Sequence, residues 1–154
     1  MKKWKCAASI TLLGGLLVAV LLRFLVVGET TTAPDGRRAI LLTPPERDMV
    51  LHEMRGFLAG VQGITVALGA EDMATVAKIA RSLGMQTAQA MPASLTGKLP
   101  LEFKQLGFSV HQDFDRMAED AGTMADPALA LKQLGETMAK CVACHQAHQI
   151  IAAL

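Results

Sequence analysis

Residues 127–148 read PALALKQLGETMAKCVACHQAH and carry apolar side chains with the period of an α-helix. Asp126 and Pro127 form a typical helix start, because Asp caps free amide groups and Pro suits the first turn. The side chains spaced three or four residues apart are Leu131, Leu134, Met138, Cys141, His145 and His148. This spacing predicts one helix whose inner stripe carries both Cys141 and His145.

Three more helices are predicted upstream. Residues 43–46, Thr-Pro-Pro-Glu, have the pattern of a capping box with Pro in the first turn. A helical stripe follows, formed by Val50, Met54, Phe57, Val61, Ile64 and Leu68. The second helix is expected to start at Glu71 and to fade near residues 91–92, and the third to start at Pro100 after a loop over residues 93–99. No segment alternates convincingly as a strand, so we predict an all-α fold, an antiparallel four-helix bundle over residues 44–154.

The first 28 residues differ in character from the rest. Lys2, Lys3 and Lys5 precede an apolar run of about 22 residues that ends at Gly28. The run predicts either a cleaved secretory signal peptide or an uncleaved membrane anchor, and its length favours the anchor. In either case we expect the domain on the periplasmic side of the inner membrane, anchored there or, after cleavage, soluble.

Residues 29–43 lack a helical apolar period and are predicted to form a linker to the domain of residues 44–154.

Cys6 precedes the apolar run, whereas a lipoprotein cysteine would follow it. We therefore interpret Cys6 as an unmodified thiol.

Charge and cysteine content exclude two broad classes of protein. The chain has 15 Lys and Arg against 14 Asp and Glu, and without the four basic residues of the leader the balance is 11 to 14. Nucleic-acid binding through a basic surface is therefore not expected. A disulfide-stapled miniprotein is excluded as well, since Cys6 stands alone and only Cys141 and Cys144 lie close together.

Residues 141–145, Cys-Val-Ala-Cys-His, match the C-x-x-C-H sequence of c-type haem attachment. Two thiols one helical turn apart can add to the two vinyl groups of one porphyrin, and the adjoining imidazole reaches the iron. A thioredoxin-like redox pair would need a strand before the motif, and structural zinc would need two further ligands. Two ordinary buried cysteines beside a core histidine are the structural alternative. We predict one haem c, bound covalently to Cys141 and Cys144, with His145 as an axial ligand of its iron.

A helical bundle with this motif in its last helix resembles the cytochrome c′ family and its Met-ligated low-spin relatives. The resemblance covers residues 44–154 and implies an Arg in the first helix, followed four residues later by the distal side chain, as in Arg47 and Leu51. The family pattern x-x-Tyr-Arg after the haem histidine is replaced here by His148 and Gln149. The resemblance also implies a possible homodimer, although the small residues of the first helix, Gly56, Gly60 and Gly63, would serve packing inside the bundle equally well.

Two side chains compete for the distal position. The Arg47 spacing favours Leu51, which would leave the iron five-coordinate, whereas Met54 offers a thioether as a sixth ligand. We predict a monohaem cytochrome that carries electrons between redox partner proteins. The alternative is a five-coordinate protein that binds nitric oxide or carbon monoxide. The sequence offers no support for an enzymatic role such as that of a peroxidase. We expect the side chains of three other histidines to be exposed: His52, His111 and His148.

Overall fold

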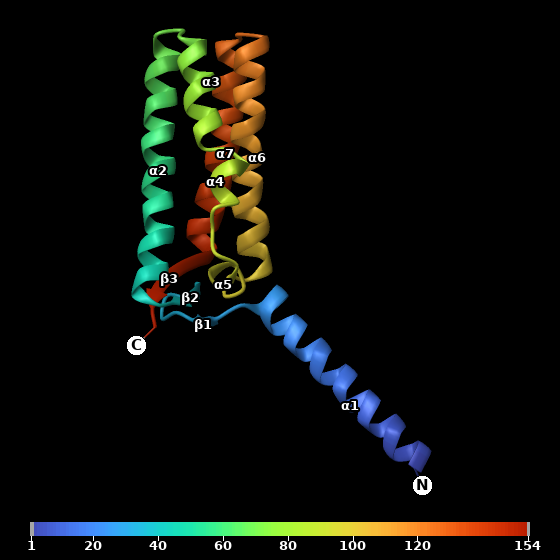
Figure 1. Cartoon of the computed structure of the whole chain (residues 1–154). Helices are drawn as coiled ribbons and strands as arrows, with labels where there is room; N and C mark the ends of the chain where they lie inside the picture. Colours follow the sequence, from blue (N-terminus) through green and yellow to red (C-terminus); the bar gives the residue numbers. More distant parts are fainter. Residues whose placement is uncertain (1, 154) are drawn as a thin grey trace.

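The structure is a computed structural model that describes the backbone of residues 2–153 and the side chains of residues 9–153. The predictions that concern the side chains of Lys2, Lys3, Lys5 and Cys6 lie outside the described side chains. A long N-terminal helix projects away from a helical domain, and a small sheet lies at the junction between them (Figure 1).

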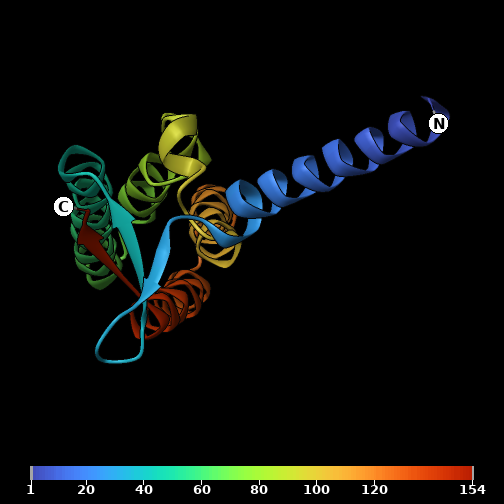
Figure 2. The ribbon, with the colours of Figure 1, turned by 90° about the horizontal axis from the view of Figure 1, so that it is seen from below.

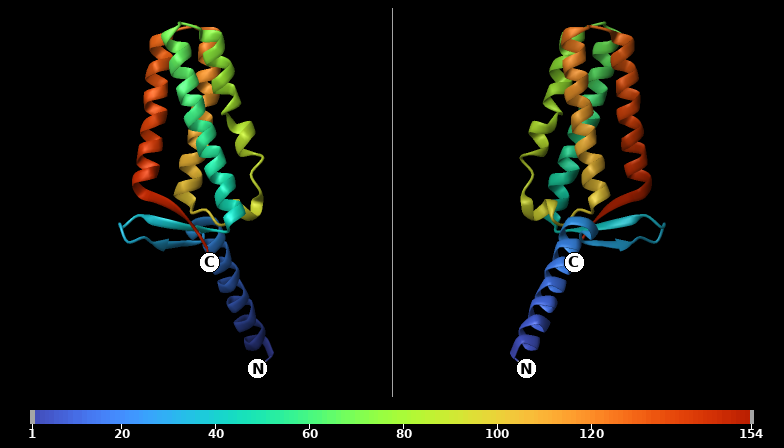
Figure 3. Two further views of the ribbon diagram at one scale, coloured as in Figure 1. Left: turned by 90° about the vertical axis from the view of Figure 1, so that its left-hand side faces the viewer. Right: turned by 90° about the vertical axis from the view of Figure 1, so that its right-hand side faces the viewer.

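The domain is mostly helical, which confirms the predicted class in its coarse form. Four of its helices lie side by side along their length (Figures 1 and 3), and contacts link the pairs α2 and α3, α3 and α6, α6 and α7, and α2 and α7. The helices of the domain are α2 (Pro44–Gly69), α3 (Met73–Ser82), α4 (Met85–Ala88), α5 (Ala93–Thr96), α6 (Leu101–Thr123) and α7 (Pro127–Ala147).

Capping side chains mark the starts of α2, α3 and α7. The capping box between Thr43 and Glu46 is present at the start of α2, as the sequence predicts. Asp72 accepts a hydrogen bond from the Thr75 amide at the start of α3, and Asp126 accepts two amide hydrogen bonds at the start of α7. Each cap satisfies amides that have no partner within the first turn.

The predicted second helix is interrupted after Ser82. Gly84 lies so close to the Asp115 carboxylate of α6 that a Cβ atom there would overlap it, and that carboxylate accepts the Met85 amide at 2.9 Å. The chain then forms the short helix α4. A second short helix, α5, occupies part of the predicted loop over residues 93–99, so the prediction of a plain loop is wrong there.

The absence of strands was wrongly predicted. A three-stranded sheet joins β1 (Thr30–Thr32), β2 (Arg38–Leu42) and β3 (His148–Ala152), with β1 antiparallel and β3 parallel to β2 (Figure 2). Residues 29–43 are therefore not a structureless tether. Strand β2 does not alternate in the sequence because its residues Ala39, Ile40 and Leu42 are all completely buried.

Two apolar clusters form the interior of the domain. One joins α2, α3, α6 and α7 around Ile64, Phe114 and Met117, and the other joins β2, α2 and α6 around Ile40, Val50 and Leu99. The second cluster lies beside the sheet, at the end of the domain from which α1 departs (Figure 1).

The N-terminal helix α1 (Lys2–Leu22) continues into one π-helical turn, η1 (Arg23–Val27). By length and composition, the segment of residues 9–27 could cross a membrane. None of its residues is buried against the domain. The end of this segment does contact the domain, because Lys104 donates to the Leu25 carbonyl at 3.0 Å and the Glu29 amide donates to the Lys98 carbonyl. At Gly28, which has a positive φ of 69°, a Cβ atom would overlap the backbone of residues 98–100.

Candidate functional site

A cavity of about 350 Å³ lies between α2, α6 and the C-terminal part of α7. Its walls are predominantly apolar and include residues of both interior clusters, such as Val50, Phe103 and Val110. The residues of the haem motif that line it are Cys141, Val142, Cys144 and His145. The C-x-x-C-H segment therefore forms part of the wall of an apolar cavity.

The inner stripe of α7 is displaced from the predicted one. The prediction placed Leu131, Met138 and His145 inside, but all three are exposed. The buried or half-buried residues of this helix that recur every three or four positions are Ala130, Leu134, Thr137, Cys141 and Cys144. Small side chains let α7 pack closely along this face, so both cysteines point inward and His145 lies at the edge of the stripe.

Both motif thiols are free and half-buried. The Cys141 thiol donates to the Thr137 carbonyl at 3.6 Å, one turn earlier in α7. Burial raises the pKa of Cys141 and of Cys144 above the ordinary thiol value, because a thiolate loses hydration in this apolar wall. The two side chains are thus neutral thiols at neutral pH, exposed to the cavity.

Met54 of α2 lines the cavity, whereas Leu51 and Arg47 do not. Leu51 is half-buried elsewhere on α2, and Arg47 pairs with Asp48 at 3.6 Å. Of the two side chains considered for the distal position, only Met54 therefore forms part of the cavity wall, where it packs against the same cluster as Cys144.

His111 of α6 was predicted to face solvent, and this prediction is wrong. Its side chain is 5% exposed, lines the cavity, and lies with its ring centroid 4.9 Å from that of Phe57. Its Nδ1 lies 2.7 Å from the Leu83 carbonyl oxygen, and its Nε2 lies 3.4 Å from a Glu53 carboxylate oxygen. Burial alone would lower the pKa of His111, but the Glu53 carboxylate and the Leu83 carbonyl outweigh it and raise this pKa above the ordinary value.

The sequence signal for this burial is the spacing of His111 from Phe114, three residues later on the buried face of α6. By contrast, His52 is exposed, as predicted.

His148 was placed by the sequence on the last helix as a surface residue, and both parts of this prediction are wrong. Helix α7 ends at Ala147, and His148 begins strand β3, where its side chain is buried against Phe103 with ring centroids 5.6 Å apart. Burial lowers the pKa of His148 below the ordinary value. The helix ends here because the chain pairs with β2, a parallel strand more than 100 residues away in the sequence. No local sequence pattern predicts this pairing.

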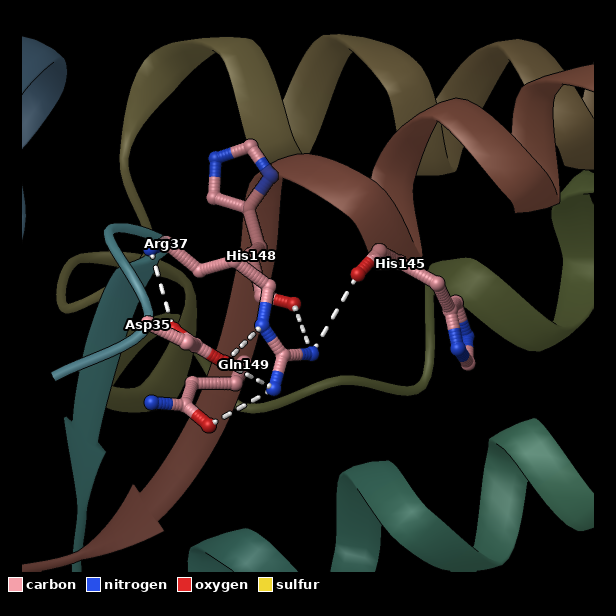
Figure 4. A network of polar contacts seen from close by, with 5 residues as sticks. All are labelled: Asp35, Arg37, His145, His148 and Gln149. Carbon is pink, nitrogen blue, oxygen red and sulfur yellow. Dashed lines mark hydrogen bonds and ion pairs between the residues drawn. The ribbon is translucent and has the colours of Figure 1, made fainter. Parts of the chain in front are cut away.

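Arg37, in the turn between β1 and β2, contacts the end of α7 (Figure 4). Its guanidinium donates to the carbonyls of His145 and His148 and to the side chain of Gln149. No local pattern predicts this contact, because it joins two segments separated by more than 100 residues.

Comparisons with protein-family models, with curated proteins and with solved structures found no match for this chain. Within the described residues, no group of three or more His, Cys, Asp or Glu side chains is arranged to hold a metal ion.

Proposed function

We propose that residues 44–154 form a c-type cytochrome of the four-helix-bundle kind, which carries one electron at a time through a single covalently bound haem c. The observation that carries this proposal is the shared cavity: Cys141, Cys144 and His145 line it from α7, and Met54 lines it from α2. The pattern of the motif alone is compatible with ordinary core cysteines. Its position in the wall of an apolar cavity favours attachment of an apolar macrocycle.

The residues present suit a haem group in three respects. The two thiols lie one helical turn apart, are free, and face the cavity. The cavity walls are apolar, as the faces of a porphyrin require. An imidazole, His145, and a thioether, Met54, come from two different helices around the same cavity. When bound, the haem would supply a one-electron iron couple.

The chain's own residues would then have separate roles. Cys141 and Cys144 would fix the group to α7, and His145 would supply an imidazole nitrogen to its iron. Met54 would supply a thioether sulfur, which raises the reduction potential relative to a weaker ligand. Apolar side chains such as Phe57, Phe103 and Val110 would exclude water from the site.

A five-coordinate protein that binds nitric oxide or carbon monoxide is the less favoured proposal. It requires Leu51 over the iron, and Leu51 does not line the cavity. We do not propose an enzymatic activity.

For location we propose that the apolar helix stays attached and holds the domain at the periplasmic face of the inner membrane. The contacts that support this are those of Leu25 and Gly28 with residues 98–104, because a segment destined for removal needs no fitted place on the domain. Its partners would be redox proteins that meet the domain at this membrane.

A homodimer through the glycines of α2 is poorly supported. A Cβ atom at Gly60 would overlap Leu83, and one at Gly63 would touch Ile79, so these two glycines admit close packing of α3 inside the domain.

Optical spectra of the purified ferric and ferrous protein, with and without carbon monoxide, test the proposal. We expect the spectrum of a six-coordinate low-spin c-type haem that carbon monoxide leaves largely unchanged. A high-spin spectrum that shifts fully with stoichiometric carbon monoxide would favour the gas-binding alternative, and absence of haem from protein expressed with a functional haem-attachment system would contradict both.

A further inference from the structure

The turn between β1 and β2 places the Arg37 guanidinium beside the carbonyls of His145 and His148, at the C-terminal end of α7 (Figure 4). Arg37 Nη1 donates to the His145 carbonyl at 3.3 Å and to the His148 carbonyl at 3.5 Å, and Arg37 Nη2 donates to Gln149 Oε1 at 3.1 Å. The last carbonyls of a helix have no partners within the helix and carry partial negative charge. A guanidinium is well suited to bind them.

Asp35 holds this guanidinium in place from the opposite side. The Asp35 carboxylate accepts hydrogen bonds from Arg37 Nε at 2.8 Å and from the Arg37 backbone amide at 3.1 Å, and it lies 2.7 Å from Nη2. The Arg37 side chain therefore has few orientations open to it, and its donors stay directed at the end of α7.

The side chain of His145 has little support of its own. It is exposed, and within residues 9–153 its ring makes no hydrogen bond. Ligating histidines in proteins are usually oriented by a hydrogen bond to the second ring nitrogen. Here the restraint acts instead on the backbone: Arg37 binds the His145 carbonyl, and the parallel pairing of β2 with β3 begins three residues later, at His148.

We infer that Asp35 and Arg37 are positioning residues, which fix the backbone of His145 and thereby the placement of its imidazole toward the haem iron. This inference rests on the proposed function. It assigns to the β1–β2 turn a role in the haem site, although the turn lies outside the four long helices and contributes no residue to the cavity wall.

The test compares the holoproteins of Arg37→Gln and Arg37→Lys with that of Arg38→Gln. Arg38 is the control for loss of a positive charge from the same hairpin: it pairs with Glu102 of α6 and donates to no carbonyl of α7, although its backbone is the strand partner of His148. Two quantities are measured: the hyperfine-shifted NMR signals of the His145 ring protons in the ferric protein, and amide hydrogen exchange over residues 146–149.

We expect Arg37→Gln to move or broaden the His145 ring signals and to speed amide exchange by about tenfold, the effect of losing a hydrogen bond from a charged donor. Arg37→Lys should fall between this variant and the wild type, because an ammonium can reach one carbonyl but cannot reproduce the fork. Arg38→Gln should match the wild type in the His145 ring signals and in amide exchange at residues 146 and 147, since the segment that Arg38 and Glu102 contact begins at His148.

Suppose that the protein holds covalent haem and that Arg37→Gln has the same ring signals and exchange rates as Arg38→Gln. This result would overturn the inference and leave the proposed function standing. A wild-type protein without covalent haem would overturn both. If Arg37→Gln does not fold, Asp35→Asn provides the decision: it keeps the guanidinium but removes its orienting partner, so we expect shifts in the same direction and smaller in size, and no shift would refute the positioning role.

Discussion

Met54 of α2 and Cys144 of α7 pack against the same apolar cluster and line the same cavity, although 90 positions separate them in the sequence. This relationship brings a thioether close to the haem motif. It also distinguishes Met54 from Leu51, which lies only one turn away on α2 and faces elsewhere.

Met54→Leu should remove the sixth ligand of the ferric iron. We expect it to abolish the Met-to-iron charge-transfer band in the near-infrared spectrum, to raise the high-spin fraction and to lower the reduction potential, because the thioether favours the ferrous state. Leu51→Ala is the matched control on the same helix and should leave the band unchanged. Loss of the band in Leu51→Ala but not in Met54→Leu would restore the distal assignment that the Arg47 spacing favours.

Removal of haem should strongly destabilise the domain. Without haem the cavity of about 350 Å³ would be open to water, and the apolar side chains of its wall would lose the group that buries them. We expect the double variant Cys141→Ser, Cys144→Ser, after extraction of any haem that it retains, to show a broad, low thermal transition by circular dichroism.

An equally sharp and equally high transition in that double variant would show that the apolar walls pack well without haem. Cys6→Ser serves as its control, since this residue lies outside the domain and should not alter the transition.

Glu46 should make domain stability depend on acid pH. The hydrogen bonds from Lys98 and Thr43 lower the pKa of Glu46 from 4.5 to about 2. Because the folded-state pKa is depressed, the stabilisation is complete above pH 4.5 and is lost as the pH falls toward 2. We expect Glu46→Gln to lower the free energy of unfolding by about 1 kcal/mol at pH 7, because Gln can still accept the Thr43 amide in the capping box but cannot form the partly exposed ion pair with Lys98.

Urea denaturation at pH 7 and at pH 2.5 checks this, and the difference between wild type and Glu46→Gln should shrink at the lower pH. Glu136→Gln is the control, because its pair with Lys132 is exposed and 3.9 Å long and should contribute little at either pH. A difference for Glu46→Gln that is constant over this range would contradict the assigned ion pair.

The apolar helix should retain the protein in the membrane. We expect the full chain in the membrane fraction, released by detergent but not by high salt, because an apolar span of 19 residues is long enough to cross the hydrocarbon core. A variant that starts at residue 29 behind a cleavable signal peptide should be soluble in the periplasm. Mature wild-type protein in the soluble fraction, with an N-terminus beyond Gly28, would show that the leader is removed.

Local patterns were sufficient to predict most of the helices. The capping residues of α2 and α7 and the stripes along α2 and α6 are short-range signals, and the structure has helices at these places. What the sequence could not provide depends on contacts distant in the chain. The pairing of β2 with β3 is such a contact, as is the approach of Asp115 to Gly84 that breaks the second helix.

Part of the candidate site could likewise be predicted from local sequence, and part could not. Cys141, Cys144 and His145 are adjacent in the sequence, so their pattern is visible without a structure. The cavity, Met54 as its lining residue, the buried His111 and the contact of Arg37 with α7 all depend on how separate helices meet. The inner stripe of α7 differs from the predicted one because the helix packs through small residues. The prediction instead followed the large apolar residues, which lie on the exposed side.

The central claim is that Cys141 and Cys144 hold one haem through thioether bonds. Acid-acetone extraction of protein expressed with a functional haem-attachment system tests it most directly, with Cys141→Ser and Cys144→Ser beside the wild type. We predict that haem stays with the wild-type chain and is absent from or extractable in the variants. Complete extraction of haem from the wild-type protein would contradict the account.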